Sequence, residues 1–571
     1  MFVKDLRKEF YDQLIGHRVL IFVNYDVDAI CATKIICNLF QYDRIQYTIV
    51  PVSDLNDLQS AYNQRKKSVK YVLMINIGAI FDVVDFFEPE DEQVIFVADN
   101  HRPIDVYNVY RDGQLRLLMK EDDTETIPPY EQLFNEEEEE EEEDDADDDD
   151  DNQKRNSRRR FTLEELEKRK RHRQWVEERG RILFEYSQFS YFGQSTAYLF
   201  FELAWKMSKD SNELLWLTIV AVSEQLLSAK TEEAAFESTC QNLNDHLKRL
   251  NHAVDQRSGS GADEASCLQQ RSITITFMKD LQLTLYRHWS LYESLRHTMS
   301  VSCKFKVWNI RGHRKLLEFL AELGMPLVQC KQKFDSMDLE FRKHCFDWVE
   351  DLAEKYELTS LIGNSFVIKK GFRGKYTSFD IAHAIKALLE SPDKTLNRYD
   401  RFFEALDSLG WNSKSTLLDS GIELSIVQHV AMLKQVHDMI DMRSVSSSGP
   451  FLYCDLPEST PDLKLFVYPG CFIQLARYVL NAFVVSSKNR RVVNLPLIMV
   501  ITDPARPDSG LAVGIPPLAE LSTKNLFGKA FIQIGQMIKC QMEPDLYDMS
   551  IIRFPIQEKS KLFESLVSLL S

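Results

Sequence analysis

The sequence predicts an α/β fold with a parallel-sheet domain at the N-terminus, a helical middle region and a smaller α/β domain at the C-terminus. Short apolar runs rich in Val and Ile alternate with helical patterns up to about residue 134, and a similar alternation returns after residue 445. Between these parts, apolar residues recur at helical spacing. The chain has 571 residues, 44% of them hydrophobic, which allows about two to four domains with their own cores.

Four apolar runs in residues 1–134 predict strands that are buried on both faces of a parallel sheet. They are "RVLIFV" (18–23), "IQYTIV" (45–50), "YVLMINI" (71–77) and "QVIFVAD" (93–99). The segments 28–43 and 53–67 between them have helical spacing, and Ser53 is predicted to cap the second helix. This β-α-β-α-β order indicates a doubly wound domain.

The remaining elements follow in order. Residues 161–255 read as helices that complete the N-terminal domain, and 256–445 as a mostly helical interdomain region for partner contacts, with a flexible break at 256–270. In this region, Gly324 and Pro326 predict the end of a helix. Residues 446–571 alternate strands and helices, and "LKLFVYP" (463–469) is expected to be a strand.

A charged insert separates the first two parts. Residues 136–151 contain fifteen acidic residues, and 154–173 contain ten basic residues against three acidic ones. Because such a composition cannot bury enough apolar surface to offset chain entropy, 135–160 is expected to be disordered. The acidic run is either a solvated linker, a tether for basic partners or a screen against DNA, and the basic clusters favour nuclear import over an exposed helix face.

Composition and motifs also argue against several classes of protein, namely zinc-binding, disulfide-rich, membrane-spanning and ATP-hydrolysing ones. The ten cysteines are scattered without C-x-x-C pairs, which argues against a zinc site and a disulfide framework. No apolar run reaches the roughly 20 residues of a membrane span, and no signal-peptide pattern is present, so an intracellular protein without membrane contact is expected. The absence of G-x-x-x-x-G-K-[ST] predicts that any ATPase motor is a partner.

Polar residues follow three of the predicted strands, where ligands bind in open parallel sheets. They are Asn24, Asp26 and Asp28 after the first strand, Asn76 after the third, and Asp99, Asn100 and His101 after the fourth. Carboxylates with an imidazole form the ligand set of paired Mg²⁺ or Mn²⁺ ions that hydrolyse phosphodiesters. Two acids as close as Asp26 and Asp28 repel each other, so a positive group is expected beside them.

These motifs resemble the DHH phosphoesterases, the family of the bacterial exonuclease RecJ. "NYDVDAICA" is similar to the first metal motif, "INIG" to the second with Asn76 in place of Asp, and "ADNHRP" to Asp-His-His with Asn100 in place of the middle His. "TIVAVSEQ" lies where the family has a further Asp, and Glu224 is its nearest counterpart. Residues 446–571 resemble the DHHA1 module, although "NLFGKAF" keeps one glycine, Gly528, and no His.

Longer strings resemble the cell division cycle protein 45 family, the eukaryotic relatives of RecJ, over the whole chain. They include "LIGHRVLIFVNYDVDAICA", "LYRHWSLYESL" and "GPFLYCDLPESTPDLKLF". The resemblance implies a nuclear, non-catalytic factor of replication initiation and elongation. Its implied partners are the MCM ATPase ring, the GINS complex, origin-firing and replisome factors, and single-stranded DNA held in a groove between the two α/β domains.

Several interpretations of the site remain open. Asn76 and Asn100 replace an Asp and a His that bind metal in the DHH family, and the further acid is displaced to Glu224. These changes predict a vestigial site with no metal, no cofactor and no catalytic residue. In that case Asp26 and Asp28 cap the following helix.

Asp99 and His101 then form a hydrogen-bonded pair before Pro103. The alternatives are an active metal-dependent single-strand exonuclease or phosphoesterase, and a nuclear adaptor that never contacts DNA.

Overall fold

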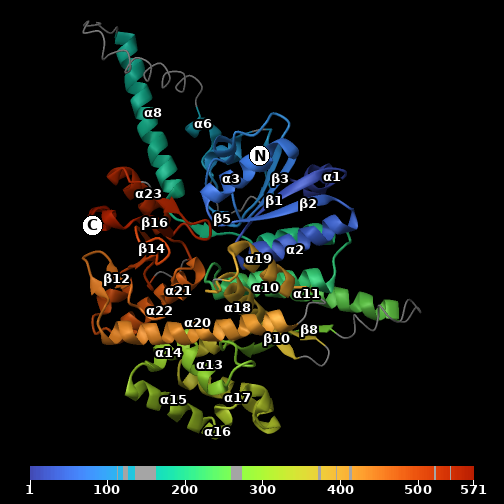
Figure 1. Ribbon diagram of the computed structural model, residues 1–571, viewed down its shortest axis with the longest axis vertical. Coiled ribbons are helices and arrows are strands. Elements are labelled where there is room, and N and C mark those ends of the chain that lie inside the picture. The colour runs from blue at the N-terminus through green and yellow to red at the C-terminus, as the bar shows by residue number, and fades with distance from the viewer. Residues whose placement is uncertain are drawn as a thin grey trace.

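Five parallel strands form a sheet in the N-terminal part of the chain, in the order β2-β1-β3-β4-β6 (Figure 1). The strands are β1 (Arg18–Asn24), β2 (Gln46–Val52), β3 (Tyr71–Ile75), β4 (Val94–Ala98) and β6 (Leu115–Leu117). The chain runs from β1 to β2 on one side and returns to β3 on the other, so the topological switch point lies between β1 and β3. The prediction of a doubly wound parallel sheet is confirmed.

The computed structural model describes residues 1–571 except 112, 120–126, 135–162, 259–272, 371–373, 394, 411–414, 520–522, 541 and 571. The predicted acidic insert at 135–160 and most of the predicted break at 256–270 therefore lie outside the described residues. Within the described ranges, no helix combines the length and hydropathy needed to cross a bilayer.

Helices cover both faces of the N-terminal sheet, as the alternation of side chains along β1 requires. Val19, Ile21 and Val23 pack into one core with α2, α9 and α10, whereas Leu20 and Phe22 pack into another with α3 and α4. The helices of this part are α1 (Asp12–Leu14), α2 (Val27–Tyr42), α3 (Leu55–Arg65), α4 (Val83–Phe87), α5 (Val106–Tyr110), α6 (Tyr130–Leu133), α8 (Leu163–Ser187), α9 (Thr196–Lys206), α10 (Asn212–Leu227) and α11 (Glu233–Ser258), with the π-turn η1 (Leu6–Tyr11) and the 3-10 turn η2 (Lys66–Ser68).

The predicted cap of α3 is wrong by one residue. Asp54 is the N-cap, and its side chain accepts a hydrogen bond of 2.8 Å from the backbone N–H of Asp57. The Ser53 N–H instead donates to the Asp57 carboxylate, at 3.4 Å. A charged carboxylate is a good acceptor at a helix N-terminus because it also interacts favourably with the helix dipole.

The middle of the chain contains a sheet as well as the predicted helices. Strands β8 (Ile273–Leu281), β9 (Ile362–Lys370) and β10 (Lys375–Thr377) form an antiparallel sheet in the order β10-β9-β8. Gly324 adopts a φ of +72° just after α15, as the predicted helix end requires. The helices are α13 (Leu291–His297), α14 (Met299–Phe305), α15 (Ile310–Glu322), α16 (Leu327–Cys330), α17 (Leu339–Lys355), α18 (Ser378–Leu389), α19 (Arg398–Ser408) and α20 (Ser415–Asp441), with the 3-10 turns η3 (Phe334–Ser336) and η4 (Thr359–Leu361).

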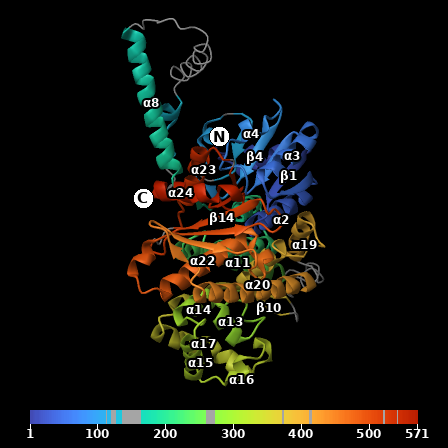
Figure 2. The same cartoon turned by 60° about the vertical axis from the view of Figure 1, so that its left-hand side comes forward.

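The hydrophobic core of this middle part joins its neighbours on both sides. Side chains of α18 and α19 pack with those of α2, α9 and α10, whereas side chains of α13 to α17 pack with the C-terminal elements. Figures 1 and 2 both show α13 to α17 at the end of the molecule opposite the N-terminal sheet, and α8 projecting away from the other helices. The domain boundaries at 134, 255 and 445 stay predictions.

The C-terminal part is a mixed sheet in the order β11-β12-β13-β14-β16-β15, in which β12 and β13 pair in parallel and the other described pairs are antiparallel. Its elements are β11 (Ser446–Ser447), β12 (Leu452–Leu456), α21 (Leu463–Phe466), α22 (Pro469–Ser486), η5 (Arg490–Asn494), β13 (Leu497–Thr502), β14 (Ser509–Ile515), α23 (Phe527–Ile538), β15 (Glu543–Pro544), β16 (Ile551–Pro555), η6 (Ile556–Glu558) and α24 (Lys559–Leu570). The expected strand at 463–469 is wrong, because Asp462 turns the chain with a φ of +58° and a single helical turn leads directly into α22.

Candidate functional site

All eight sequence-predicted site residues are buried, and they lie around the carboxyl edge of the N-terminal sheet at its switch point. The group consists of Asn24, Asp26, Asp28, Asn76, Asp99, Asn100, His101 and Glu224. Strands β1, β3 and β4 are adjacent and parallel, so the residues that follow them meet at one edge. Glu224 comes from α10, which packs against α2 beside the same edge.

Asp28 is saturated with hydrogen-bond donors. Its Oδ2 accepts bonds from the side-chain amides of Asn76 at 3.1 Å and Asn100 at 2.9 Å. Three further donors come from the start of α9: the Ser195 hydroxyl at 2.5 Å, the Thr196 N–H at 2.9 Å and the Ala197 N–H at 3.1 Å. A carboxylate offers about four lone-pair positions, so these five bonds leave none for another ligand.

The pKa of Asp28 is nevertheless raised above its ordinary value. Burial is the main cause, and the neighbouring Asp26 carboxylate adds to it, although the bonds from Ser195 and the α9 backbone act in the opposite direction. The Asp28 carboxylate is therefore held by neutral hydrogen-bond donors, although burial disfavours its charge.

Asp26 is the N-cap of α2, as predicted, and accepts a 3.0 Å bond from the Asp28 N–H. The prediction that Asp28 also caps this helix is wrong, because its oxygens accept from other segments. Asp26 Oδ2 accepts the second amide hydrogen of Asn76, at 2.6 Å. The Asn76 NH₂ group thus lies between the two carboxylates, and its own Oδ1 accepts from the Thr196 hydroxyl at 2.5 Å.

Lys230 supplies the positive charge that the two neighbouring acids require. Its Nζ lies 3.7 Å from Asp26 Oδ1 and 3.5 Å from Glu224 Oε2, and the residue is only 4% exposed. The ammonium also faces the rings of Phe192 and Tyr547, at 5.0 and 4.6 Å from their centroids. Burial opposes the charged form, but Asp26 and Glu224 raise the pKa of Lys230 well above its ordinary value.

The turn that ends α10 positions Lys230. Ala229 adopts a φ of +50°, and the Lys230 N–H donates to the Gln225 carbonyl at 2.8 Å, which turns the chain back over the last helical turn. Glu224 is fixed on the same turn, because its Oε1 accepts from the Ser228 hydroxyl at 2.6 Å.

Asp99 and His101 form the hydrogen-bonded pair that the sequence predicted, with 2.6 Å between Oδ1 and Nδ1. Asp99 also accepts from the Ala79 N–H at 2.9 Å. Burial disfavours both charges, yet the pair raises the pKa of His101 and lowers that of Asp99. The pair therefore favours an imidazolium and a carboxylate.

The C-terminal part covers the site through backbone carbonyls. His101 Nε2 lies 3.2 Å from the Tyr547 carbonyl oxygen, and Asn24 Nδ2 donates to the Leu546 carbonyl at 2.8 Å. Asn24 also donates to the Asn76 carbonyl at 3.0 Å. The expected open groove between the two α/β parts is therefore closed over these residues.

The donor set does not fit a divalent ion. A two-metal centre needs carboxylate oxygens with free lone pairs. Here Asn76, Asn100 and the start of α9 direct hydrogens at those oxygens, and the ammonium of Lys230 lies between two of the acids. No group of three His, Cys, Asp or Glu side chains arranged to hold a metal occurs in the part of the chain that the structure describes.

The structure brings the predicted residues together at one edge of the sheet, and five of them form one network of side chains. Asp26, Asp28, Asn76 and Asn100 bond directly, and Glu224 joins them through Lys230. Asp99 and His101 form a separate pair beside them.

Sequence reasoning missed Lys230, Ser195, Thr196 and Tyr547. The Ser-Thr pair before the apolar run of α9 is a recognisable N-cap signal, and the surplus of buried acids required a cation. Neither signal identifies Lys230 among the lysines of the chain.

The chain is similar to known proteins over nearly its whole length. The family model described as CDC45 matches residues 19–158 and 120–568. The cell division control protein 45 homolog of Homo sapiens is 39% identical over 576 residues, which cover 100% of both chains, and that of Schizosaccharomyces pombe is 26% identical over 96% of each. Among solved structures, CDC45 from Entamoeba histolytica has a TM-score of 0.70 at 20% identity, covering 99% of this chain and 100% of that one. The exonuclease RecJ bound to manganese has a TM-score of 0.42 at 10% identity, covering 100% and 94%.

The family model extends over nearly the whole sequence, and the human relative aligns with it from end to end. The Entamoeba structure has the same fold. The chain therefore belongs to the CDC45 family, as its longer motifs predicted.

Proposed function

We propose that this chain is a non-catalytic factor of DNA replication, which acts in the nucleus during initiation and elongation. In this proposal it is a scaffold and activator of a helicase formed with the MCM ATPase ring and the GINS complex, together with origin-firing and replisome factors. Membership of a family whose relatives are named cell division control proteins supports the role in replication and the cell cycle.

The observation that carries the non-catalytic assignment is the set of donors on Asp26 and Asp28. The Asn76 amide lies between the two carboxylates, and the Lys230 ammonium lies between Asp26 and Glu224. Two unit charges about 4 Å apart repel by roughly 4 kcal/mol at the effective dielectric of a protein, and the double charge of a metal ion doubles that value. A divalent ion at these acids would have to overcome this repulsion and displace the amide hydrogens.

The competing function is a metal-dependent single-strand exonuclease. The test incubates the purified full chain with a 5′-labelled single strand and Mn²⁺, beside the double variant Asp26→Ala plus Asp28→Ala. We expect both proteins to leave the strand intact. Degradation by the original chain that the double variant abolishes would overturn the proposal.

Partner contacts are proposed for the α13 to α17 helices, where large apolar side chains face solvent. Ile310, Val328 and Leu339 are 77%, 72% and 54% exposed. Such side chains lose water-exposed surface when a protein partner covers them. The variant Ile310→Glu plus Val328→Glu is expected to fold but to lose co-purification with MCM and GINS, whereas Met537→Glu, a 62% exposed residue of α23, is expected to retain it.

Binding of single-stranded DNA is proposed for an apolar groove of about 610 Å³ between the N- and C-terminal parts. Its lining includes Phe81, available for base stacking, and Lys539, available for a phosphate. Photocrosslinking to a single strand within the assembled complex should give an adduct in this groove that Phe81→Ala reduces. No crosslink to any part of the chain would favour an adaptor that never contacts DNA.

A further inference from the structure

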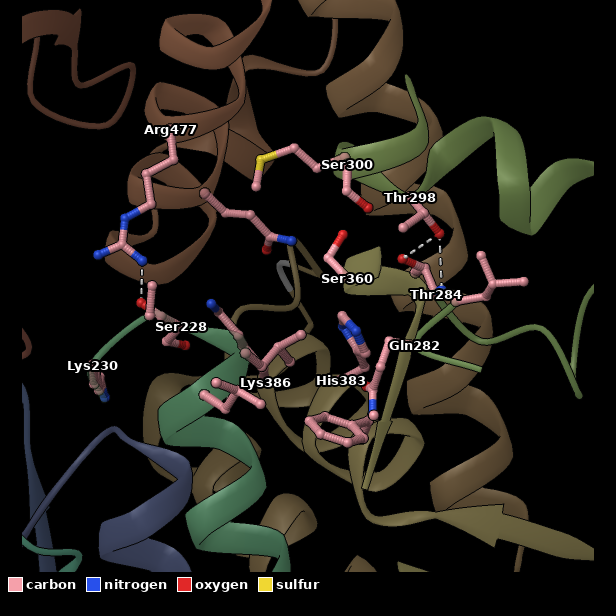
Figure 3. Close-up of a pocket in the computed structure, with 18 of the residues that line it drawn as sticks. Ser228, Lys230, Gln282, Thr284, Thr298, Ser300, Ser360, His383, Lys386 and Arg477 are labelled. Atoms are coloured by element: carbon pink, nitrogen blue, oxygen red, sulfur yellow. Dashed lines mark hydrogen bonds between the residues drawn. The ribbon is translucent and has the colours of Figure 1, made fainter. Parts of the chain in front are cut away.

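A second cavity, of about 670 Å³, lies between the end of α10, the starts of α14 and β9, and the helices α18 and α22 (Figure 3). Its volume falls in the usual range of small-molecule sites. It lies on the opposite side of Lys230 and Tyr547 from the Asp28 network, since both residues contribute to its wall.

Two cations point into one side of this cavity. Figure 3 shows the Lys386 and Arg477 side chains on the same side of the cavity, with the Arg477 guanidinium turned toward Ser228. Arg477 donates one hydrogen bond to the Ser228 carbonyl, and its other guanidinium N–H groups have no hydrogen-bond partner among the described residues. Within the described residues, the Lys386 ammonium forms no salt bridge or hydrogen bond, whereas the Lys386 carbonyl accepts from the Glu390 N–H at 3.1 Å.

Four acidic residues contribute to the described lining of the cavity, namely Glu233, Glu237, Asp380 and Asp548. Asp380 is already bound to His288 at 3.4 Å and to the Thr377 N–H at 2.9 Å. The Asp548 carboxylate acts on Arg477 and partly offsets the burial that lowers the pKa of this guanidinium, whereas Glu233 and Glu237 are exposed at the rim.

The acid that acts most directly on Lys386 is Glu390, on the next turn of α18. Burial raises its pKa to about 7, and its Oε2 has no hydrogen-bond partner in the described part of the chain. Burial therefore disfavours the charged form of Glu390, although Lys386 acts in the opposite direction.

The rest of the lining combines hydroxyl groups with an apolar wall. Ser300 and Ser360 face the two cations across the cavity in Figure 3. Phe236 and Phe379, with ring centroids 6.1 Å apart, provide apolar surface at another side. Cations at one end and aromatic rings elsewhere match a ligand that has both an anionic group and a flat ring.

We propose that this cavity binds a phosphorylated small molecule of nucleotide size, with its phosphate between Lys386 and Arg477 and its ring against the apolar wall. The two cations hold the phosphate by charge-assisted hydrogen bonds, and the hydroxyls of Ser300 and Ser360 orient the remainder of the ligand. This site is independent of the proposed helicase role, so either can fail without the other.

Isothermal titration calorimetry of the full chain with AMP, and separately with inorganic phosphate, tests the proposal. AMP is expected to bind more tightly than phosphate, because only AMP reaches the apolar wall. Lys386→Gln and Arg477→Gln are each expected to weaken AMP binding at least about tenfold, the usual loss for one charged hydrogen bond. Lys434→Gln, an exposed position on α20, is the matched control and should bind like the original chain.

A second measurement covers the case in which a cavity variant fails to fold. Acetylation of the original chain, followed by mass spectrometry, should show that AMP protects Lys386 but leaves Lys434 unchanged. Three results would each overturn the proposal: no heat and no protection at millimolar AMP, unaltered affinity in both cavity variants, or equal binding of phosphate and AMP.

Discussion

Replacing Lys230 with Met removes the ammonium and keeps an apolar stem of similar length. The change leaves Asp26 and Glu224 buried beside Asp28 without a positive partner, at 2%, 0% and 0% exposure. Removing one member of a buried ion pair costs about 3–5 kcal/mol, and the lost contacts with two aromatic rings act in the same direction. We therefore expect Lys230→Met to lower the local free energy of opening by about 3–5 kcal/mol.

The loss should depend on pH with a definite sign. Burial and Asp26 already raise the pKa of Asp28, and the variant removes the nearby ammonium, so its native state binds more protons than the unfolded chain. Its stability then rises as the pH falls from neutral toward 5, and the difference from the original chain shrinks. In the original chain the pKa of Lys230 is raised, so its contribution is present below the unfolded value and is lost only at alkaline pH.

Hydrogen exchange with mass spectrometry measures this local stability without assuming that the whole chain unfolds in one step. Peptides covering β1 and α2 should exchange faster in Lys230→Met at pH 7.5, with a smaller difference at pH 5.5. The control is Lys209→Met, which breaks a partly exposed pair with Asp43 at 2.5 Å and should cost about 0–1 kcal/mol. Equal effects of the two substitutions, or no pH dependence for Lys230→Met, would refute the reasoning.

Three further predictions concern the fold. Asp54→Ala should destabilise the chain by about 1 kcal/mol in thermal melts because it removes the α3 cap, whereas Ser53→Ala should remain within about 0.5 kcal/mol. Gly312→Ala should lower the free energy of unfolding by more than about 2 kcal/mol, since its Cβ would lie 2.1 Å from the Lys306 carbonyl oxygen. Its control is Gly180→Ala, whose Cβ meets nothing within 4 Å and which should stabilise α8 by up to about 1 kcal/mol. Burial raises the pKa of Glu390 to about 7, so the free energy of unfolding falls as the pH rises through the interval from 4.5 to 7. Glu390→Gln should remove this slope and stabilise the chain by up to about 3 kcal/mol at pH 8. Urea titrations at several pH values measure both effects. An unchanged slope in Glu390→Gln would contradict the assignment.

Much of the fold could be predicted from hydrophobic patterns, because a strand buried on both faces needs a continuous apolar run. The run 18–23 became β1 with one added residue, and its neighbours paired in parallel. The exception at 463–469 has a similar apolar composition, but its conformation is set by the left-handed turn at Asp462 and the adjacent α22. Short apolar runs do not distinguish a strand from one helical turn when tertiary contacts decide.

The site could be predicted only in part. The topology places Asp26, Asp28 and Asn76 at one edge, and the motif spacing alone was enough to expect it. What those groups bind to could not be predicted, because Lys230 lies in a surface-like sequence, "SAKTEE", with no motif around it. Only the charge balance of a buried cluster identifies the need for a cation, and only the fold selects which lysine meets it.

We propose that amide and ammonium hydrogens occupy the positions that metal ions would need at Asp26 and Asp28. Manganese binding tests it most directly, with electron paramagnetic resonance titrations of the purified chain and of the triple variant Asn76→Asp, Asn100→His and Lys230→Met. The account predicts no tightly bound Mn²⁺ in the original chain and measurable binding in the variant. Two Mn²⁺ ions held at these acids in the original chain, visible by their spin coupling and by anomalous diffraction from soaked crystals, would contradict it.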